Sequence, residues 1–327
     1  MKKAITIARE ASVKYLIHLG LEQEEAELVM ENIIEAELAG RKTHGLTRLI
    51  SFTRQLKEKE VNNDPLKLDI IHESPTLLHI DGHRKLGYGI IYKSLDLAIA
   101  KAKQSGLVSV GIKDLGATGY IGAYARKAAH EDFIYIGFHN SAGGLIPHGA
   151  KKDLWGTNPL TVGIPTDREP VILDMASASI TIGDILLAQR EKKEIPSGVA
   201  LDREGKPTTN PIQAYAGGIL PIAGYKGSGL GLIIELLAGA LTGSRVGYSV
   251  PGGWGSFYIL IDPSQFRPVP EFKRDVQTAL EELKNAPKLE GVSEIYYPGE
   301  QSNAQRKTHI QEGVIEVSDA LIELLHL

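Results

Sequence analysis

The chain has 327 residues, enough for two domains with well-buried cores, and its 43% hydrophobic and 23% charged residues are ordinary for a soluble globular protein. The formal net charge of −4 indicates no general attraction to nucleic acid or to anionic lipid. The sequence contains no cysteine, which excludes disulfides, thiolate nucleophiles and cysteine-ligated metal centres. It shows neither a signal-peptide pattern nor a bilayer-length apolar run, so we expect a cytoplasmic protein that binds neither nucleic acid nor membrane.

The first part of the chain, up to about Lys59, has a helical pattern throughout. Gly40 is suited to end one of these helices, because the residue after a helix often adopts the left-handed conformation. A second apolar run begins soon afterwards, at Leu46. The first run repeats apolar residues at helical spacing, at Ala26, Val29, Met30, Ile33 and Ala36.

Between these two runs lies the sequence Gly40-Arg-Lys-Thr-His-Gly-Leu-Thr-Arg48. The pattern predicts that Thr43 or His44 starts the second helix, with Arg48 one turn further on the same face. An imidazole would then lie beside a guanidinium that can bind a carboxylate in a bidentate fork, as reduction of a 2-oxo acid requires. The alternative is a corner between helices, in which His44 only caps and Arg48 is solvated.

Beyond Pro65, strand and helix patterns alternate, which favours an α/β domain. The two histidines His79 and His83 flank Asp81 with metal-like spacing, but a turn with exposed histidines explains them equally, because no further ligand is near in sequence. Expected strands are 66–71, 76–80, 107–112, 133–138, 160–164, 171–175, 256–261 and 293–297, and expected helices are 92–104, about 121–129, 180–191, 230–241, 270–284 and 305–327.

The common phosphate-binding and nucleophile motifs are missing. The glycines from Gly227 to Gly231 and the pair Gly87 and Gly89 both lack the third glycine of a Rossmann fingerprint at the required spacing. No Walker A loop and no Gly-x-Ser-x-Gly elbow is found. A dinucleotide, if bound, must be bound in another way.

A set of short motifs along nearly the whole chain resembles the malate/L-lactate dehydrogenase family that is separate from the Rossmann-type dehydrogenases. This family includes sulfolactate dehydrogenase, ureidoglycolate dehydrogenase, diketogulonate reductase and a cyclic-imine reductase. Each motif is weak alone, and their order and spacing carry the resemblance. They are Thr43-His-Gly45 with Arg48, Gly116 to Tyr120, Asn140-Ser141, Gly156 to Pro159, Leu173 to Ala176, Leu201-Asp202, Thr208 to Pro211, Gly224 to Gly227, Phe257 to Pro263, and Pro298 to Glu300.

The resemblance implies an α/β fold in which a mixed-sheet cofactor domain of non-Rossmann type packs against a mainly helical domain. The helical domain would comprise residues 1–65 and about 305–327, and residues 66–304 would form the α/β cofactor- and substrate-binding domain. An extended NAD or NADP would lie between the two domains, in a homodimer that contains no metal. The reaction would interconvert a small 2-oxo acid and its 2-hydroxy acid.

By the same resemblance, His44 is the general acid that protonates the carbonyl oxygen, and Arg48, Tyr120 and Asn158 bind the substrate. An imidazole with an ordinary pKa near ~6.5 suits such a proton transfer at neutral pH. Among the cofactor contacts, Lys226 suits phosphate or ribose oxygens, and glycine at Gly227 permits a close approach to a ligand. The implied cofactor-binding residues are Ser141, Asp174, Met175, Ala176, Ser177, Lys226, Gly227, Gly299 and Glu300.

Each of these motifs also has a purely structural interpretation. Asp174 can cap the next helix at a strand exit. The stretch from Gly224 to Gly231 can be a tight helix entry, Lys226 can be solvated, and Pro298-Gly299 is a common turn pair.

One position departs from the family pattern: many members carry a histidine where this chain has Asp114. Either His44 alone transfers the proton, or Asp114 is a second catalytic residue that supports an imidazole or a substrate hydroxyl. A carboxylate there would repel a second substrate carboxylate, which argues against plain malate. His148 is a further histidine close to the expected cofactor region. Two other functions stay open, a reductase of a cyclic imine or other carbonyl compound and a catalytically idle cofactor-binding relative, and no pattern separates NADH from NADPH.

Overall fold

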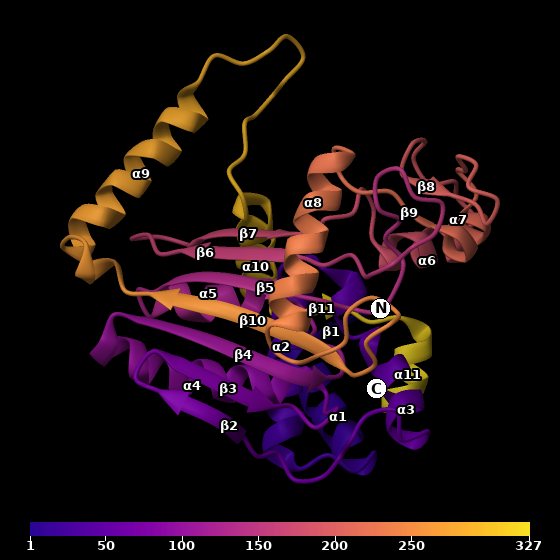
Figure 1. The fold of residues 1–327 in the computed structure, drawn as a ribbon, viewed down its shortest axis with the longest axis horizontal. Coiled ribbons are helices and arrows are strands. Elements are labelled where there is room, and N and C mark those ends of the chain that lie inside the picture. The colour runs from indigo at the N-terminus through magenta and orange to yellow at the C-terminus, as the bar shows by residue number, and fades with distance from the viewer.

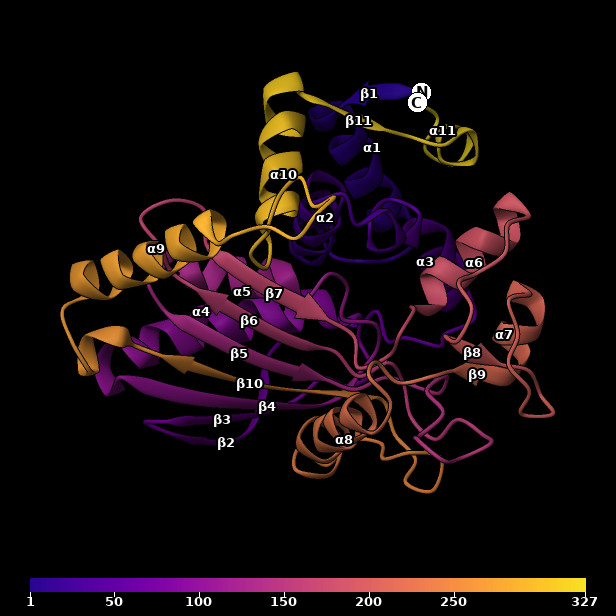
Figure 2. The same ribbon diagram turned by 90° about the horizontal axis from the view of Figure 1, so that it is seen from above.

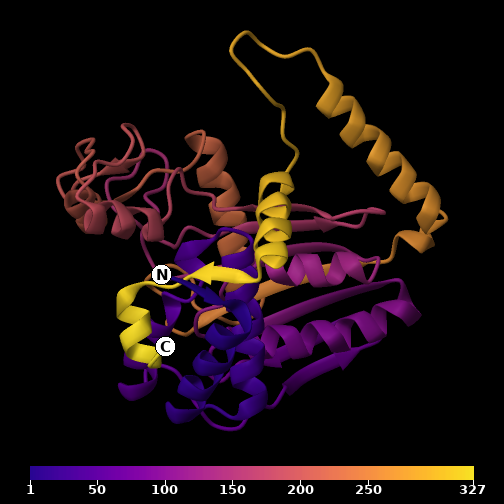
Figure 3. The ribbon, with the colours of Figure 1, turned by 180° about the vertical axis from the view of Figure 1, so that it is seen from behind.

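The computed structural model describes residues 1–327 and begins with a helical region (Figure 1). Strand β1 (Lys2–Ala4) precedes helices α1 (Ile5–His18) and α2 (Gln23–Leu38), the 3-10 turn η1 (Lys42–His44) and helix α3 (Arg48–Lys57). The end of the chain returns to this region: α10 (Glu300–Glu312) leads to β11 (Val314–Glu316), which pairs with β1, and then to α11 (Asp319–Leu325). The two termini therefore lie close together (Figure 3).

The centre of the molecule is a seven-stranded mixed sheet in the order β2-β3-β4-β10-β5-β6-β7. Only β3 and β4 run parallel, and every other neighbouring pair is antiparallel. The strands are β2 (Asp69–Ser74), β3 (Leu77–Asp81), β4 (Leu107–Leu115), β5 (Ile134–His139), β6 (Leu160–Ile164), β7 (Val171–Met175) and β10 (Trp254–Ile261).

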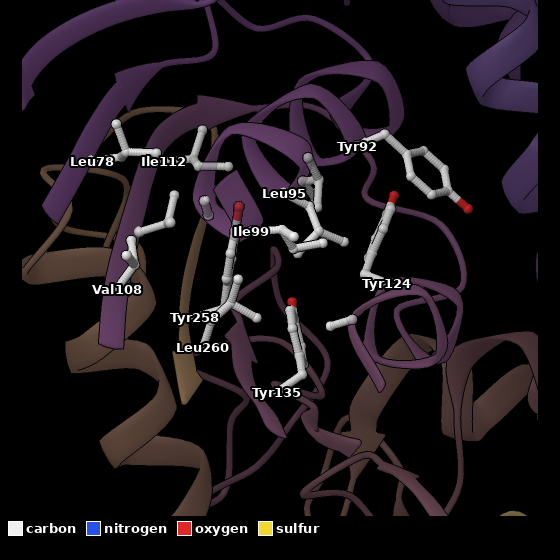
Figure 4. Close-up of a cluster of buried hydrophobic side chains, with 14 of the residues drawn as sticks. Leu78, Tyr92, Leu95, Ile99, Val108, Ile112, Tyr124, Tyr135, Tyr258 and Leu260 are labelled. Carbon is white, nitrogen blue, oxygen red and sulfur yellow. The ribbon is translucent and has the colours of Figure 1, made fainter. Parts of the chain in front are cut away.

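Helices α4 (Gly87–Ser105) and α5 (Gly122–His130) cover one face of this sheet. Figure 2 shows them on the side opposite to α8 (Tyr225–Ile234). The core between sheet and helices contains Tyr135 and Tyr258, whose rings stack with centroids 5.2 Å apart, together with Leu95 and Ile99 from α4 (Figure 4). Alternate residues of each strand point into this core, as the two-residue period of a strand requires.

On the opposite face, helix α8 continues into a π-helix, η2 (Glu235–Ala240), which crosses one end of the sheet. Gly255 in β10 permits this crossing, since a Cβ there would lie 1.7 Å from the carbonyl oxygen of Ala238. The rest of this face has no helical layer, and its side chains are half-buried.

A small third unit, absent from the sequence-based division, lies between β7 and α8. It contains α6 (Ile182–Glu191), α7 (Pro211–Gly217) and the short pair β8 (Ala200–Leu201) and β9 (Gly218–Ile219). Its own apolar cluster includes Leu145, Ile185 and Ile219. The sequence predicted only α6 and loops here, because two-residue strands leave no recognisable pattern.

Helix α9 (Val269–Asn285) and the following residues project from the body of the molecule (Figures 1 and 3). The predicted strand at 293–297 is wrong, because no strand lies beside this projecting segment to pair with it. Helix α8 begins at Tyr225, five residues before the predicted start.

The predicted α/β class with a mixed sheet is confirmed, and so are most elements. The apolar residues predicted for α2 are all buried. All but Ala36 belong to a helical-region cluster that also contains Ile315, Leu321 and Leu325 from the chain end, whereas Ala36 packs with Tyr120. The two-domain division stays a prediction. No helix combines the length and the apolarity needed to cross a bilayer.

Candidate functional site

The segment between α2 and α3 turns sharply. Gly40 ends α2 in the left-handed conformation with φ +72°, as predicted. His44 closes the turn η1 and Arg48 opens α3, so the two are not on one helix, and that part of the prediction is wrong. The buried carboxylate of Glu37 causes the break: it accepts a hydrogen bond from the Leu46 amide at 2.7 Å and occupies the space where Gly45 would carry a Cβ.

The His44 imidazole is half-buried, with Nδ1 3.2 Å from Thr43 Oγ1. Burial, together with the positive charges of Arg48 and Arg41, lowers the pKa of His44 to about 4. Asp184 opposes this shift. His44 is therefore a neutral imidazole at neutral pH, between two cations and one carboxylate.

Asp184, which acts on His44 through its charge, belongs to the third unit and lies in the first turn of α6. A capping box places it there: the Asp184 amide donates to Thr181 Oγ1 at 3.1 Å, and the Thr181 hydroxyl donates to Asp184 Oδ2 at 2.7 Å. The turn η1 packs closely on α6, since a Cβ at Gly183 would lie 2.8 Å from Thr43 Cβ. Sequence analysis missed Asp184, although the Thr-x-x-Asp pattern is a recognisable helix start.

The Arg48 side chain has an unused donor. Its Nε is buried without a hydrogen-bond partner, its guanidinium carbon lies 5.9 Å from the centroid of the Phe52 ring, and it forms no ion pair. The neighbouring Tyr88 hydroxyl is also buried and unpartnered, and burial raises the pKa of Tyr88. Buried polar groups are normally hydrogen-bonded, so the unpartnered Nε leaves this guanidinium with a free donor that suits an anionic ligand.

The positive charge of Arg41 acts on His44, on Tyr120 and on Asp174. Burial raises the pKa of Asp174 to about 6, against the opposing effect of the Arg41 charge. Asp174 Oδ2 accepts from the amide of Gly122 at 3.0 Å, so Asp174 caps α5 rather than the next helix. Burial and the charge of Asp174 raise the pKa of Tyr120 to about 12. Sequence analysis did not select Arg41, which lies three residues before His44.

The raised pKa of Asp174 predicts a stability that falls as pH rises. Its folded-state pKa of about 6 exceeds the ordinary value near ~3.9, so the folded chain binds the proton more tightly than the unfolded chain. That contribution is present below pH ~4 and is lost as pH rises through about 6. The free energy of unfolding of Asp174→Asn, measured in urea relative to that of the parent chain, should therefore rise by about 2 kcal/mol as the pH is raised from 4 to 7. A constant difference between the two chains would contradict this environment for Asp174.

Ser177 and Gly227 pack against each other at the start of α8. Ser177 is fully buried, and its hydroxyl donates to the Thr157 carbonyl at 2.8 Å. A Cβ at Gly227 would lie 2.2 Å from the carbonyl oxygen of Ile222 and 2.7 Å from that of Ser177. Glycine is therefore required at position 227 because the backbone of the chain itself, and not a ligand, comes close to it. This agrees with the structural interpretation of the stretch as a tight helix entry.

Asn158 and Ser141 form a structural connection on the other side of α8. Asn158 is fully buried with φ +33°, and its side-chain amide donates to the Gly231 carbonyl at 3.0 Å and to Glu235 Oε2 at 2.7 Å. Its Oδ1 accepts from the Ser141 amide at 3.3 Å. With these atoms occupied, Asn158 positions the loops around α8, and no contact brings it to His44 or Arg48.

Asp114 also has local partners, at the end of β4. Its backbone has φ +54°, and Oδ1 accepts from the Gly253 amide at 2.6 Å. Its own amide donates to Ser244 Oγ at 3.2 Å. No contact connects Asp114 with His44, and His148 lies instead beside Tyr225 at the start of α8, with ring centroids 6.5 Å apart.

The histidines around Asp81 form no metal centre, and no cluster of three metal-binding side chains occurs in the structure. His79 Nε2 lies 2.9 Å from the Thr242 carbonyl oxygen, and His83 Nε2 lies 2.8 Å from Asp69 Oδ2.

The remaining cofactor candidates lie along β7, the edge strand of the sheet. At its start, Gly299 begins α10 with φ +86° against the backbone of Ile172, and Glu300 accepts from Lys284 Nζ at 2.7 Å. At its end, Asp174, Met175 and Ala176 lead toward Ser177 and α8. The strand spans about 13 Å at ~3.3 Å per residue.

Comparisons with known proteins identify the family of the chain. The family model described as malate/L-lactate dehydrogenase matches residues 4–326. The chain belongs to this family. It is 34% identical to malate/(S)-sulfolactate dehydrogenase of Methanothermus fervidus over 325 residues, which cover 97% of this chain and 94% of the relative.

Solved structures of the family have the same fold. The sulfolactate dehydrogenase of Methanocaldococcus jannaschii superposes with a TM-score of 0.90 at 34% identity, covering 99% of this chain and 95% of that one. The malate dehydrogenase of Pyrococcus horikoshii OT3 gives a TM-score of 0.89 at 30% identity, covering 99% and 93%.

Proposed function

We propose that this protein is an NAD(P)-dependent dehydrogenase that interconverts a 2-hydroxy acid and its 2-oxo acid at the corner formed by His44 and Arg48. The observation that carries this proposal is the buried, unpartnered Nε of Arg48 next to a neutral imidazole. The guanidinium supplies a fork for a carboxylate, and the imidazole exchanges a proton with the adjacent hydroxyl or carbonyl oxygen.

The residues along β7 and at the start of α8 fit an extended dinucleotide. The amide of Ile172 donates to the Pro298 carbonyl at 3.2 Å, away from β6, and the alternation of an antiparallel ladder then points the Asp174 amide outward as well. Lys226 is exposed in the first turn of α8 and forms no ion pair, which suits a phosphate oxygen. A bound nicotinamide supplies or accepts the hydride.

His44 has the properties of a proton acceptor in the direction of hydroxy acid oxidation, since it is neutral before substrate binds. In the reverse direction it must carry a proton. A substrate carboxylate on Arg48 offsets one of the charges that lower the His44 pKa, and Asp184 favours the imidazolium. Arg48 holds the substrate with its reacting oxygen beside the imidazole. The free energy of carboxylate binding then offsets the translational and rotational entropy that is lost when the reacting groups are brought together.

The low pKa of His44 predicts the pH dependence of the oxidation reaction. Because kcat/KM reports the free enzyme, its acidic limb should lie near the lowered His44 pKa of about 4 rather than near ~6.5. The measurement is a kcat/KM profile for the hydroxy acid from pH 4 to pH 8. An acidic limb near pH 6.5 would show that His44 is solvated or is not the base.

The two cations beside His44 favour a substrate with two negative groups. Arg48 would bind the carboxylate, and Arg41 lies close enough to act electrostatically on His44, Tyr120 and Asp174. Asp114 does not oppose this choice, since it contacts neither His44 nor Arg48 and is not among the charges that act on His44. Two relatives are named malate and sulfolactate dehydrogenases, and both of those substrates are dianions.

A substrate panel with both cofactors tests the proposal. Oxaloacetate and sulfopyruvate should be reduced with a higher kcat/KM than pyruvate, while a cyclic imine carboxylate should react poorly. Preference for the imine would favour the alternative reductase, and tight cofactor binding without turnover would favour an idle relative.

Three further properties belong to this proposal. The cofactor is NAD or NADP: one relative is named a sulfolactate dehydrogenase (NADP(+)) and another a ureidoglycolate dehydrogenase (NAD(+)). The protein is proposed to act as a homodimer, in the cytoplasm.

A further inference from the structure

The guanidinium of Arg48 is supported by neutral groups. Its central carbon lies 5.9 Å from the centroid of the Phe52 ring, one turn further along α3, and no carboxylate pairs with it. A carboxylate of the chain would compete with that of a substrate for the same N–H groups. A guanidinium that binds substrate therefore needs neutral supports, and the Phe52 ring is one of them, through its contact with the cation.

Tyr88 packs against the same aromatic ring. It lies in the first turn of α4, is fully buried, and meets Phe52 edge-on, with ring centroids 5.6 Å apart and an interplanar angle of 82°. A Cβ at Gly119 would collide with the Tyr88 ring, so the loop between β4 and α5 also packs tightly on it. This packing on two sides fixes the position of the Tyr88 hydroxyl.

The Tyr88 hydroxyl and Arg48 Nε are both buried, and neither has a hydrogen-bond partner. Burial raises the pKa of Tyr88, and the neighbouring Arg48 opposes that rise through its charge and its N–H groups. Tyr88 is therefore a neutral phenol at neutral pH, and its oxygen can accept a hydrogen bond. The guanidinium has only donors, so the phenol oxygen and the Nε–H group are complementary.

We propose that Tyr88 is a positioning residue for Arg48: its hydroxyl oxygen accepts from Arg48 Nε and so turns the two terminal nitrogens of the guanidinium toward the substrate carboxylate. This inference rests on the function proposed above and deepens it. Nε is the one Arg48 nitrogen that is buried without a partner, so the terminal nitrogens remain for the fork. The carboxylate is then bound end-on, and the neutral phenol leaves the full positive charge available to it.

Tyr88→Phe removes the acceptor oxygen and keeps the ring. We expect KM for the 2-oxo acid to rise roughly 3–10-fold, the effect of losing one hydrogen bond, with kcat and the cofactor affinity nearly unchanged. The dissociation constant of oxalate from the enzyme–NADH complex, measured by fluorescence without turnover, should rise by the same factor.

Tyr135→Phe is the matched control. Tyr135 is also fully buried with an unpartnered hydroxyl, but its ring stacks on Tyr258 in the core of the sheet (Figure 4). Its removal should leave the substrate KM and the oxalate dissociation constant unchanged. If Tyr88→Phe and Tyr135→Phe behave alike, the Tyr88 hydroxyl does not position Arg48, and the inference is wrong.

Arg48→Lys tests whether Tyr88 acts through Arg48. Lysine has a methylene group where arginine has Nε, so the phenol oxygen has no donor there to accept from. When Arg48→Lys is also present, Tyr88→Phe should change the oxalate dissociation constant by less than about twofold, the non-additivity expected of two residues that act together. An effect as large as in the parent chain would show that Tyr88 acts independently of Arg48 and would overturn the inference.

Failure of this inference and failure of the proposed function give different results. If Arg48→Lys weakens oxalate binding while Tyr88→Phe has no effect, Tyr88 only fills space and the proposed site stands. If Arg48→Lys leaves oxalate binding unchanged, the carboxylate is bound elsewhere, and both the site and the inference are wrong.

Discussion

Replacement of His44 by alanine should reduce turnover by ~10²–10⁴-fold, the usual contribution of a positioned general acid or base. The affinity for NADH or NADPH should stay nearly unchanged, because the residues proposed to bind the cofactor lie along β7 and at the start of α8. Steady-state turnover and fluorescence titration of the cofactor measure the two effects separately.

His83→Ala is the matched control for this experiment. His83 is exposed, and its partners are Asp69 at the start of β2 and Asp81 at the end of β3, neither of which contacts His44, so its removal should leave turnover unchanged. Equal turnover of His44→Ala and the parent chain would remove His44 from the mechanism.

Replacement of Arg48 by lysine should raise KM for the 2-oxo acid by ~10–100-fold, because a charge-assisted hydrogen bond contributes ~1.5–3 kcal/mol and lysine cannot form the bidentate fork. The cofactor KM should change little. Initial-rate measurements with oxaloacetate or sulfopyruvate as the varied substrate test this expectation.

Arg54→Lys provides the control on the same helix. Arg54 is exposed and pairs with Glu58 at 3.3 Å and Glu60 at 2.5 Å, so the exchange should not alter the substrate KM. If Arg48→Lys and Arg54→Lys behave alike, the carboxylate is bound elsewhere.

Local patterns were sufficient for most of the fold. The strands 160–164 and 171–175 were predicted with their observed bounds, because a turn at Pro165 separates two short apolar runs. The start of α8 was predicted too late, since glycines at 227, 229 and 231 suggested a loop. They lie inside the helix, where Gly227 fits against the carbonyl oxygens of Ile222 and Ser177.

The candidate site was predictable only in part. His44 and Arg48 are close in sequence, so both could be chosen as candidates, although the single helix predicted to carry them is not formed. Asp184 comes from a helix 140 positions further along the chain, so only the packing of Gly183 against Thr43 reveals its approach to His44. In the opposite sense, Asn158 and Ser177 match family motifs, but their side chains bind other parts of the chain.

A crystal structure of the protein with NAD(H) and oxalate, a non-reacting analogue of a 2-oxo acid, tests the central claim most directly. We expect the nicotinamide ring beside the end of β7, with the oxalate between it and His44 and one carboxylate paired with Arg48. A nicotinamide ring remote from His44, or oxalate bound without Arg48, would rule out this active site.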